Sequence, residues 1–232
     1  TLGIPGEDLD GVRQGVDFLR ELNLTGETVV GKNVAIIGGG NVAIDVARSA
    51  VRLGAEEVTI LYRRTRKEMP AWEEEICAAE DEGVKITYLA APVELLEENG
   101  HVSAVKVIQM ELGEPDASGR RRPVPVKDSE YDIKIDQLIP AIGQRPDISV
   151  LEELADVKIS RWDTTEVHPV TLETDMKGVF AGGDLQTGPS VAIAAIAAGM
   201  EAAESIHRYL IGRDMEEDRE IPAVEEPQFR PV

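Results

Sequence analysis

The chain has 232 residues, 42% hydrophobic and 29% charged, so it is long enough for one large globular domain or two smaller ones. Its 24 basic and 44 acidic side chains give a net charge of −20, which argues against a nucleic-acid partner or an anionic membrane surface. A single cysteine, Cys77, excludes an internal disulfide framework and an iron–sulfur cluster ligated by this chain alone. We expect Cys77 to be a small buried residue on a helix.

The first 30 residues are expected to form a linker and a short helix that come from the side of a neighbouring domain. Val16, Leu19 and Leu22 have helical spacing, and residues 26–31 are expected to be a linker into the next strand. Residues 1–10 are polar and acidic, unlike a signal peptide, and no apolar run reaches the ~20 residues that span a bilayer. These features predict a cytoplasmic protein with no membrane insertion.

A strand, a glycine turn and a helix follow in direct succession. Val34–Ile37 is a short apolar run, typical of a strand buried on both faces of a parallel sheet. Three glycines end it, and from Val42 the apolar residues recur with helical spacing. Glu57–Leu61 then supplies a second strand. Together these elements predict a βαβ unit and a Rossmann-like α/β domain over residues 31–145.

The glycine spacing fits a dinucleotide-binding fingerprint that ends in alanine, Gly38-x-Gly40-x-x-Ala43. Gly38 allows a tight turn out of the strand, and Gly40 lets the backbone approach a pyrophosphate. Ala43 lets the helix pack close to the strand, and the helix N-terminus presents free N–H groups to phosphate oxygens. The alternative is an ordinary strand-to-helix turn, which the surrounding strands make the weaker hypothesis.

A basic run, Tyr62–Lys67, follows the second strand at the position that decides between NAD and NADP. NAD-binding units usually place an acid here for the ribose 2′-hydroxyl, and this chain has none. Arg63 and Arg64 are expected to bind a 2′-phosphate, with Arg66 and Lys67 as helpers. The sequence therefore favours NADP(H), and the alternative is a solvated basic loop.

The middle of the chain continues the sheet and then changes its pattern. Met69–Trp72 is expected to start a helix, and a packing role for Trp72 is favoured over a place in the lining of a nicotinamide pocket. Val84–Leu89 predicts a third strand, and alternation from 90 to 138 predicts a small antiparallel excursion before a strand at Gln137–Ala141. Arg120–Arg122 is expected to be a solvated cluster beside a hairpin tip.

A second glycine-terminated segment occurs at Lys177–Asp184. Val179–Ala181 predicts a short strand, and Asp184 could accept hydrogen bonds from sugar-alcohol hydroxyls. A helix rich in small residues is expected from Thr187–Ser190 to about Leu210, its N-terminus favouring a ligand's negative charge. The alternative is a turn with an N-cap. Gly143 and Pro146 indicate a crossover between domains, and residues 213–232 an extended acidic tail.

Five motifs together resemble the flavin-dependent NADPH oxidoreductases typified by the small (β) subunit of bacterial glutamate synthase. They are IPGEDLDGV, GGGNVAIDVAR, YRRTRKEMPA, AIGQRPD and GVFAGGDLQTGPSVAIAAIAAG. The resemblance implies two Rossmann-like domains, one for FAD and one for NADPH, with the second inserted into the first. It assigns 31–145 to the NADPH domain and 146–212 to the C-terminal segment of the FAD domain.

The resemblance also implies which residues contact the cofactors. The glycine turn would follow the NADPH pyrophosphate, the paired arginines would hold the 2′-phosphate, and the second glycine segment would meet the FAD ribityl, phosphates and flavin ring edge. The expected cofactor contacts are Gly38, Gly39, Gly40, Asn41, Val42, Arg63, Arg64, Gly143, Gly183, Asp184, Pro189, Ser190 and Val191. Hydride transfer depends on stacking and orientation, so no catalytic residue is named.

The sequence departs from this family in one respect, since it has no earlier glycine fingerprint for FAD and no upstream iron–sulfur cysteines. We therefore expect an incomplete FAD site, completed by a missing N-terminal half or by a larger redox complex. The leading hypothesis is an NADPH-handling part of a flavin oxidoreductase that passes electrons to iron–sulfur clusters or a partner enzyme. A non-catalytic nucleotide-binding scaffold is the alternative. A simple dehydrogenase is disfavoured by only three histidines and no Tyr-x-x-x-Lys pair.

Overall fold

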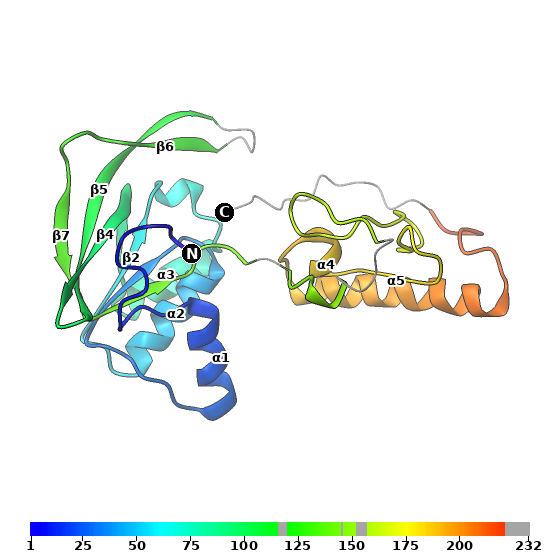
Figure 1. Ribbon diagram of the computed structural model, residues 1–232, viewed down its shortest axis with the longest axis horizontal. Helices are drawn as coiled ribbons and strands as arrows, with labels where there is room; N and C mark the ends of the chain where they lie inside the picture. The colour runs from blue at the N-terminus through cyan, green and yellow to red at the C-terminus, as the bar shows by residue number, and fades with distance from the viewer. Residues whose placement is uncertain (116–119, 145, 152–156, 221–232) are drawn as a thin grey trace. The chain divides into compact units, whose positions relative to one another are not determined.

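The computed structural model describes residues 1–115, 120–144, 146–151 and 157–220 (Figure 1). The described chain divides into two compact units, Thr1–Ile142 and the residues from Gly143 onward. Each unit is considered separately. The hairpin-tip residues 116–119, Arg145 of the AIGQRPD motif and the part of the expected tail from 221 lie outside the described residues.

A four-stranded parallel sheet forms the centre of the first unit. Its order is β3 (Lys85–Tyr88), β2 (Glu57–Tyr62), β1 (Asn33–Ile37), β8 (Gln137–Pro140). Every neighbouring pair is parallel, with Ile36 of β1 opposite Ile60 of β2 and Ile139 of β8. The four strands predicted from apolar runs are therefore confirmed, because a strand buried on both faces has few polar positions.

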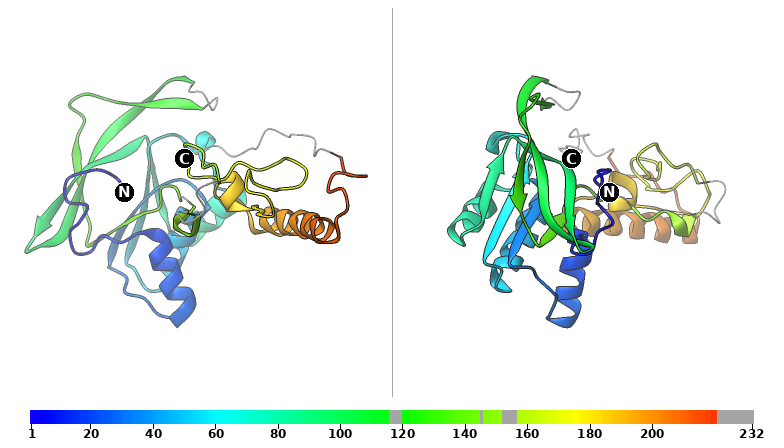
Figure 2. Two further views of the ribbon diagram at one scale, coloured as in Figure 1. Left: turned by 45° about the vertical axis from the view of Figure 1, so that its right-hand side comes forward. Right: turned by 60° about the vertical axis from the view of Figure 1, so that its left-hand side comes forward.

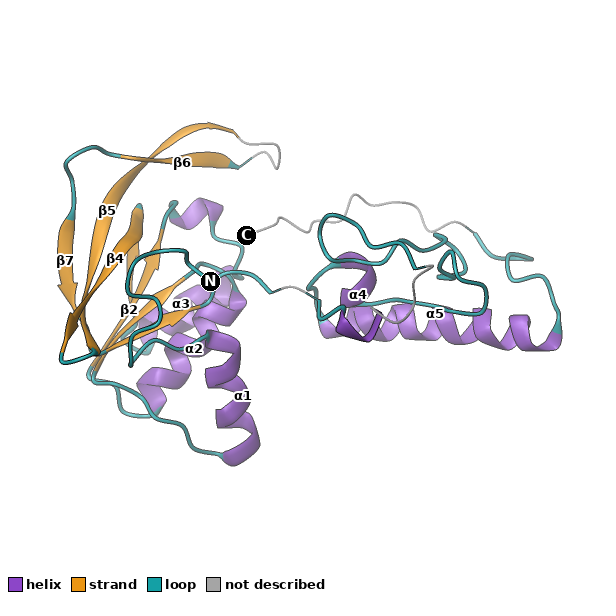
Figure 3. Cartoon of the chain, in the orientation of Figure 1, coloured by secondary structure: helices purple, strands orange, loops and turns teal. Residues whose placement is uncertain are grey.

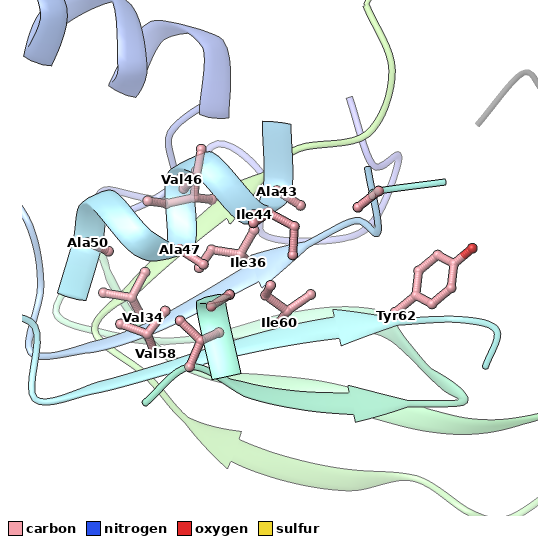
Figure 4. Packing of buried hydrophobic residues seen from close by; sticks show 14 of the residues in the cluster. Val34, Ile36, Ala43, Ile44, Val46, Ala47, Ala50, Val58, Ile60 and Tyr62 are labelled. Atoms are coloured by element: carbon pink, nitrogen blue, oxygen red, sulfur yellow. The ribbon is translucent and has the colours of Figure 1, made fainter. Parts of the chain in front are cut away.

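Three helices cover one face of this sheet: α1 (Gly15–Thr25), α2 (Asn41–Arg52) and α3 (Glu73–Asp81). In Figure 4, Val34, Ile36 and Ile60 of the strands lie against Ile44 and Ala47 of α2. Alternate residues of β1 point to this layer, as period-2 side-chain direction requires. The predicted helix after the glycine turn is confirmed.

The third helix starts later than the sequence predicted. Residues Arg66–Glu68 form a short 3-10 turn, and α3 begins at Glu73 rather than at Met69. A capping box closes the short turn. The Thr65 N–H donates to Glu68 Oε2 at 3.2 Å, and the Thr65 side chain accepts a hydrogen bond from the Glu68 backbone N–H. This local closure ends the helical segment before Pro70.

An antiparallel sheet covers the second face. It contains β4 (Ala90–Glu98), β5 (His101–Pro115), β6 (Arg121–Pro125) and β7 (Tyr131–Lys134), with β5 pairing with the other three (Figure 3). Val102, Val105 and Val107 of β5 pack against Ala35 and Ile37 of β1. The predicted antiparallel excursion is confirmed, and β6 is an additional strand that the alternation did not indicate. Figure 2 shows β5 and β6 extending as an arm beyond the sheet.

The N-terminal segment packs on the first unit. Leu2, Ile4, Leu9 and Val12 lie against the cluster between the two sheets. Short parallel bridges join Asp10 to His101 and Val12 to Leu138. Residues 1–30 are therefore integral to the unit that contains the glycine turn.

The second unit contains α4 (Asp184–Thr187), α5 (Ala192–Ile211) and a 3-10 turn, Ser149–Leu151. The long predicted helix is confirmed as α5. The predicted strand Val179–Ala181 is wrong, because Phe180 makes only one isolated antiparallel bridge, to Glu173. Its neighbours bond to irregular backbone, with Ala181 N–H donating to the Leu172 carbonyl at 3.0 Å. In the described residues, no helix is both long and apolar enough to cross a membrane.

Candidate functional site

At each of the three glycines that follow β1, an added Cβ would meet a different environment. Gly38 has a φ of +146°, and a Cβ there would lie 2.5 Å from the Ala141 carbonyl oxygen. A Cβ on Gly39 would lie 2.5 Å from the Tyr62 ring. A Cβ on Gly40 would meet only Pro70, at 3.9 Å. The first two glycines are required by packing, whereas the third leaves open space in front of the helix.

That open space faces the N-terminus of α2. Gly40 is the N-cap, with φ −91° and ψ 176°, and has no side chain to cap the helix. Within the described residues, no acceptor is bonded to the backbone N–H groups of Asn41 and Val42. Ala43 is completely buried, which allows the helix to approach the strand. Such an end offers donors and a partial positive charge to a phosphate group.

The loop that follows β2 is tied to this turn. The Tyr62 hydroxyl donates to the Glu68 carbonyl at 2.6 Å. The Ala71 N–H donates to the Gly39 carbonyl at 3.1 Å, and the Trp72 N–H donates to Asn41 Oδ1 at 3.2 Å. Burial raises the pKa of Tyr62, so the hydroxyl stays a neutral donor. These hydrogen bonds therefore hold the basic loop and the glycine turn together as one continuous surface.

The two arginines predicted to share a 2′-phosphate have different environments. Arg63 is exposed, whereas Arg64 is only 4% exposed. The Arg64 Nε–H donates to the Arg121 carbonyl of β6 at 2.8 Å. Arg63 therefore faces solvent at the end of β2, whereas Arg64 is buried and bonded to the backbone of β6.

The two expected helpers also differ. Arg66 forms ion pairs with Glu73 at 2.8 Å and Glu80 at 2.7 Å, and these carboxylates raise the pKa of its guanidinium. Its charge is therefore engaged by α3. Lys67 is exposed on the same loop. Of the four predicted cations, Arg63 and Lys67 are the ones whose side chains reach solvent most fully.

Three further expectations about side chains are wrong. Trp72 is 60% exposed, so it does not have the favoured packing role. Cys77 is exposed, because Ile76 and Ala79 define the buried face of α3 and position 77 falls outside it. Arg120 is only 5% exposed, so it does not belong to a solvated cluster, although Arg121 and Arg122 are exposed.

Three of the predicted residues of the second unit line an open groove of about 520 Å³ between residues 180–184 and α5. Gly183 has a φ of +63°, and a Cβ there would lie 3.1 Å from the Ala195 Cβ. Asp184 Oδ1 accepts the Ser190 N–H at 3.1 Å, so this carboxylate joins α4 to the segment before α5. The structure therefore brings Gly183, Asp184 and Ser190 together.

The remaining three expected contact residues of the second unit are not part of the groove lining. Val191 is the N-cap of α5, has no capping side chain and is 48% exposed, and Pro189 is half-buried. Gly143, the first residue of the second unit, is exposed with a φ of +65°. Gly143 does not line the groove.

Comparisons with known proteins identify the family of this chain. Residues 1–199 match the pyridine nucleotide-disulphide oxidoreductase family. The chain is 48% identical to the NADP(+)-dependent formate dehydrogenase subunit beta of Moorella thermoacetica, over 90% of this chain and 30% of that protein. It is 43% identical to the NADPH-Fe(3+) oxidoreductase subunit beta of Geobacter sulfurreducens, over 90% of this chain and 35% of that protein.

The resemblance to glutamate synthase is confirmed at lower identity. The Azospirillum brasilense glutamate synthase [NADPH] small chain is 38% identical over 88% of this chain and 45% of its own length. The chain thus spans less than half the length of these three relatives.

Solved structures support the fold. The T. acidophilum thioredoxin reductase has a TM-score of 0.70 and 23% identity, over 91% of this chain and 62% of that one. Mycobacterium tuberculosis FprA in complex with NADPH has a TM-score of 0.70 and 17% identity, over 91% and 61% of the two chains. The α/β fold class is confirmed, and the chain belongs to the pyridine nucleotide-disulphide oxidoreductase family.

Proposed function

We propose that this chain is the NADPH-handling part of a flavin oxidoreductase. The observation that carries the proposal is the open surface at Gly40, bordered by the uncapped α2 N-terminus and the basic loop. A pyrophosphate fits there because no Cβ fills the space and the N–H groups of Asn41 and Val42 are directed outward from the helix end. Bound NADPH supplies a hydride, which FAD accepts.

Residues 38–42 would hold the pyrophosphate, with the structural glycines Gly38 and Gly39 keeping the turn closed beneath it. Arg63 would bind the 2′-phosphate, because it is the exposed arginine at the end of β2 and a guanidinium matches phosphate oxygens. Arg64, whose Nε–H donates to the Arg121 carbonyl, would hold the loop in place.

The second unit would contribute part of an FAD site. Its groove, with Gly183, Asp184 and Ser190 on one side and the small residues of α5 on the other, gives a ligand close access to backbone. Pro189 and Val191 would lie at the flavin edge, and Gly143, at the start of the unit, would contact the cofactor. The names of the relatives, a formate dehydrogenase subunit and a glutamate synthase small chain, support a place in a larger redox enzyme. In this proposal, a further polypeptide segment carries the FAD fingerprint and the iron–sulfur clusters, and the protein is cytoplasmic.

Cofactor choice tests the proposal most cleanly. NADPH and NADH affinities are measured by fluorescence titration for the wild type, Arg63→Gln and the control Arg20→Gln, an exposed arginine on α1. We expect Arg63→Gln to weaken NADPH about tenfold or more and NADH less than about twofold, since one charge-assisted hydrogen bond is involved. The control changes neither affinity.

Equal loss of both cofactors would contradict the 2′-phosphate assignment, and a wild-type chain that binds neither would contradict the nucleotide site. A visible absorption spectrum of the chain mixed with FAD tests the second unit. Weak flavin retention by the chain, with flavin bands that NADPH bleaches in its native complex, is the expected result. Absence of flavin from both would favour the non-catalytic scaffold.

A further inference from the structure

The outer parts of β5 and β6, with the residue that precedes β6, form a projecting hairpin, here called the β5–β6 arm, made of residues 110–115 and 120–125. Its side chains hold it together from within, since Arg121 Nε–H donates to the Gly113 carbonyl at 3.1 Å. The arm is also fastened to the loop after β2. The Arg64 Nε–H donates to the Arg121 carbonyl at 2.8 Å, which joins residues 57 positions apart in the sequence. This bond places the arm directly against the basic loop.

Arg120 lies at the point where the arm meets that loop. Its Cα is one peptide unit, about 3.8 Å, from that of Arg121, whose carbonyl accepts the Arg64 bond. Its side chain is only 5% exposed, whereas that of Arg122, two residues further along the chain in β6, is exposed. Arg120 is therefore directed into the protein at this junction, and Arg122 is directed away from it.

The same junction contains the end of β2. Burial raises the pKa of Tyr62, and the positive charges of Arg64, Arg120 and Arg63 act in the opposite direction, so each of these charges is within electrostatic reach of the Tyr62 hydroxyl. The Tyr62 ring packs under Gly39 of the glycine turn. Two arginines of the basic loop and Arg120 of the arm thus act electrostatically on the side chain that connects this loop to the pyrophosphate surface.

We propose that Arg120 is a third cation of the 2′-phosphate site, supplied by the inserted β5–β6 arm, and that it sets the preference for NADPH together with Arg63. The ligand chemistry is that of a phosphate dianion, whose several acceptor oxygens match more than one guanidinium group. Arg64 is a positioning residue, because its bond to the Arg121 carbonyl holds the arm where Arg120 meets the loop. The inference rests on the proposed NADPH site and adds a residue that belongs to no glycine or basic-run motif.

The experiment compares two probes that differ only in the 2′-phosphate, adenosine 2′,5′-bisphosphate and AMP, by calorimetric titration of the 232-residue chain. The variants are Arg120→Gln, Arg63→Gln and the matched control Arg122→Gln, which removes the same charge two residues away on the exposed side of the arm. We expect Arg120→Gln to weaken the bisphosphate about tenfold and AMP less than twofold, with Arg122→Gln changing neither by more than twofold. Thermal unfolding of each variant reports whether the fold is retained.

The outcomes separate this inference from the proposed function. Selective loss in Arg63→Gln with none in Arg120→Gln overturns the role of Arg120 and leaves the NADPH site standing. A wild-type chain that binds both probes equally overturns the NADPH site itself. Equal loss of both probes in Arg120→Gln, or the same loss in Arg122→Gln, also overturns the inference, because it indicates support of the fold or a general charge effect.

A second measurement on the wild type keeps the test decisive if Arg120→Gln does not fold. The Arg120 side-chain Nε–H resonance is followed in the ¹⁵N-labelled chain during titration with each probe. We expect it to shift with the bisphosphate and not with AMP. A resonance that responds equally to both probes, or to neither, contradicts a contact between Arg120 and the 2′-phosphate.

Discussion

Helices α2 and α5 both follow a glycine turn, but they are packed very differently. In α2, five of the twelve residues are buried: Ala43, Ile44, Val46, Ala47 and Ala50. In the twenty-residue α5, the buried residues are Ser205 and Arg208, while Ile193 is 69% exposed and Met200 70% exposed. Apolar side chains of this size are normally covered. One helix has its covering layer within the described chain, and the other does not.

This difference distinguishes the surface at Gly40, which the described chain supports by its own packing, from the groove beside α5, which it supports only in part. The surface at Gly40 rests on two packed layers, one of helices and one of antiparallel strands. The groove beside α5 is lined by small residues on a helix with little packing beneath it. The contrast supports the proposal that the NADPH surface is self-sufficient and that the FAD surface needs a further segment.

The largest effect is expected when the same substitution is made in both helices. Ala47 is completely buried in α2, and Ala197 is exposed in α5. Ala47→Asp should lower the free energy of unfolding by at least about 3 kcal/mol, because a carboxylate would be buried among apolar side chains. Ala197→Asp should cost less than about 1 kcal/mol, mostly helix propensity. Urea unfolding followed by circular dichroism measures both, and similar losses would show that α5 is covered in solution.

The next largest effect is expected from a comparison of Gly38, which the packing of the turn requires, with Gly40, which leaves open space in front of α2. Gly38→Ala should cost about 2 kcal/mol or more, since its φ of +146° disfavours alanine and the Cβ would lie 2.5 Å from a carbonyl oxygen. Gly40→Ala should cost less than about 1 kcal/mol, because its φ of −91° suits alanine. Unfolding free energies and NADPH affinities are compared in parallel.

In that pair, Gly40→Ala should weaken NADPH about tenfold while the protein remains folded, because the added methyl occupies the space left for the pyrophosphate. Unchanged affinity in Gly40→Ala would remove the pyrophosphate from this surface.

The smallest effect concerns the attachment of the N-terminal segment to the first unit. His101 Nδ1 lies 3.1 Å from Asp10 Oδ2, and Nε2 lies 2.9 Å from the Asp136 carbonyl oxygen. Both neighbours accept hydrogen bonds, so the protonated ring, which donates from both nitrogens, fits best. The hydrogen bond with Asp10 and that with Asp136 raise the pKa of His101 above its usual 6.5.

A raised pKa means that this stabilisation is fully present below pH 6.5 and is lost as the pH rises through the folded-state value. The Tm difference between the wild type and His101→Gln should therefore narrow from pH 6 towards pH 9. His207→Gln on α5 is the matched control. A difference that is constant with pH would show that His101 acts through packing alone.

The parts of the structure that the sequence predicted are those with local signals. Apolar runs, glycine spacing and helical periodicity located β1, α2, β2 and α5 within a few residues. The turn residues of the fingerprint were identified because glycine has a local steric meaning. The same signals assigned a strand at Val179–Ala181, where no neighbouring strand completes a ladder in the described residues.

The parts that were missed depend on contacts between distant residues. Arg64 and Arg63 are adjacent in sequence, and only the pairing of β5 with β6 places a carbonyl over one of them. Arg120 belongs to a run of three arginines that looks uniformly solvated, yet the first is buried and the other two are exposed. Charge and composition carry no information about such burial, since they are the same for all three residues.

The most direct test of the account is an amide spectrum of the ¹⁵N-labelled chain recorded during titration with NADP⁺. The account predicts that the largest shifts occur at Gly40, Asn41 and Val42, where the uncapped α2 N-terminus faces the open space, followed by Arg63 at the end of β2. Shifts confined to the second unit, or no shifts at saturating nucleotide, would contradict an NADPH site at this turn.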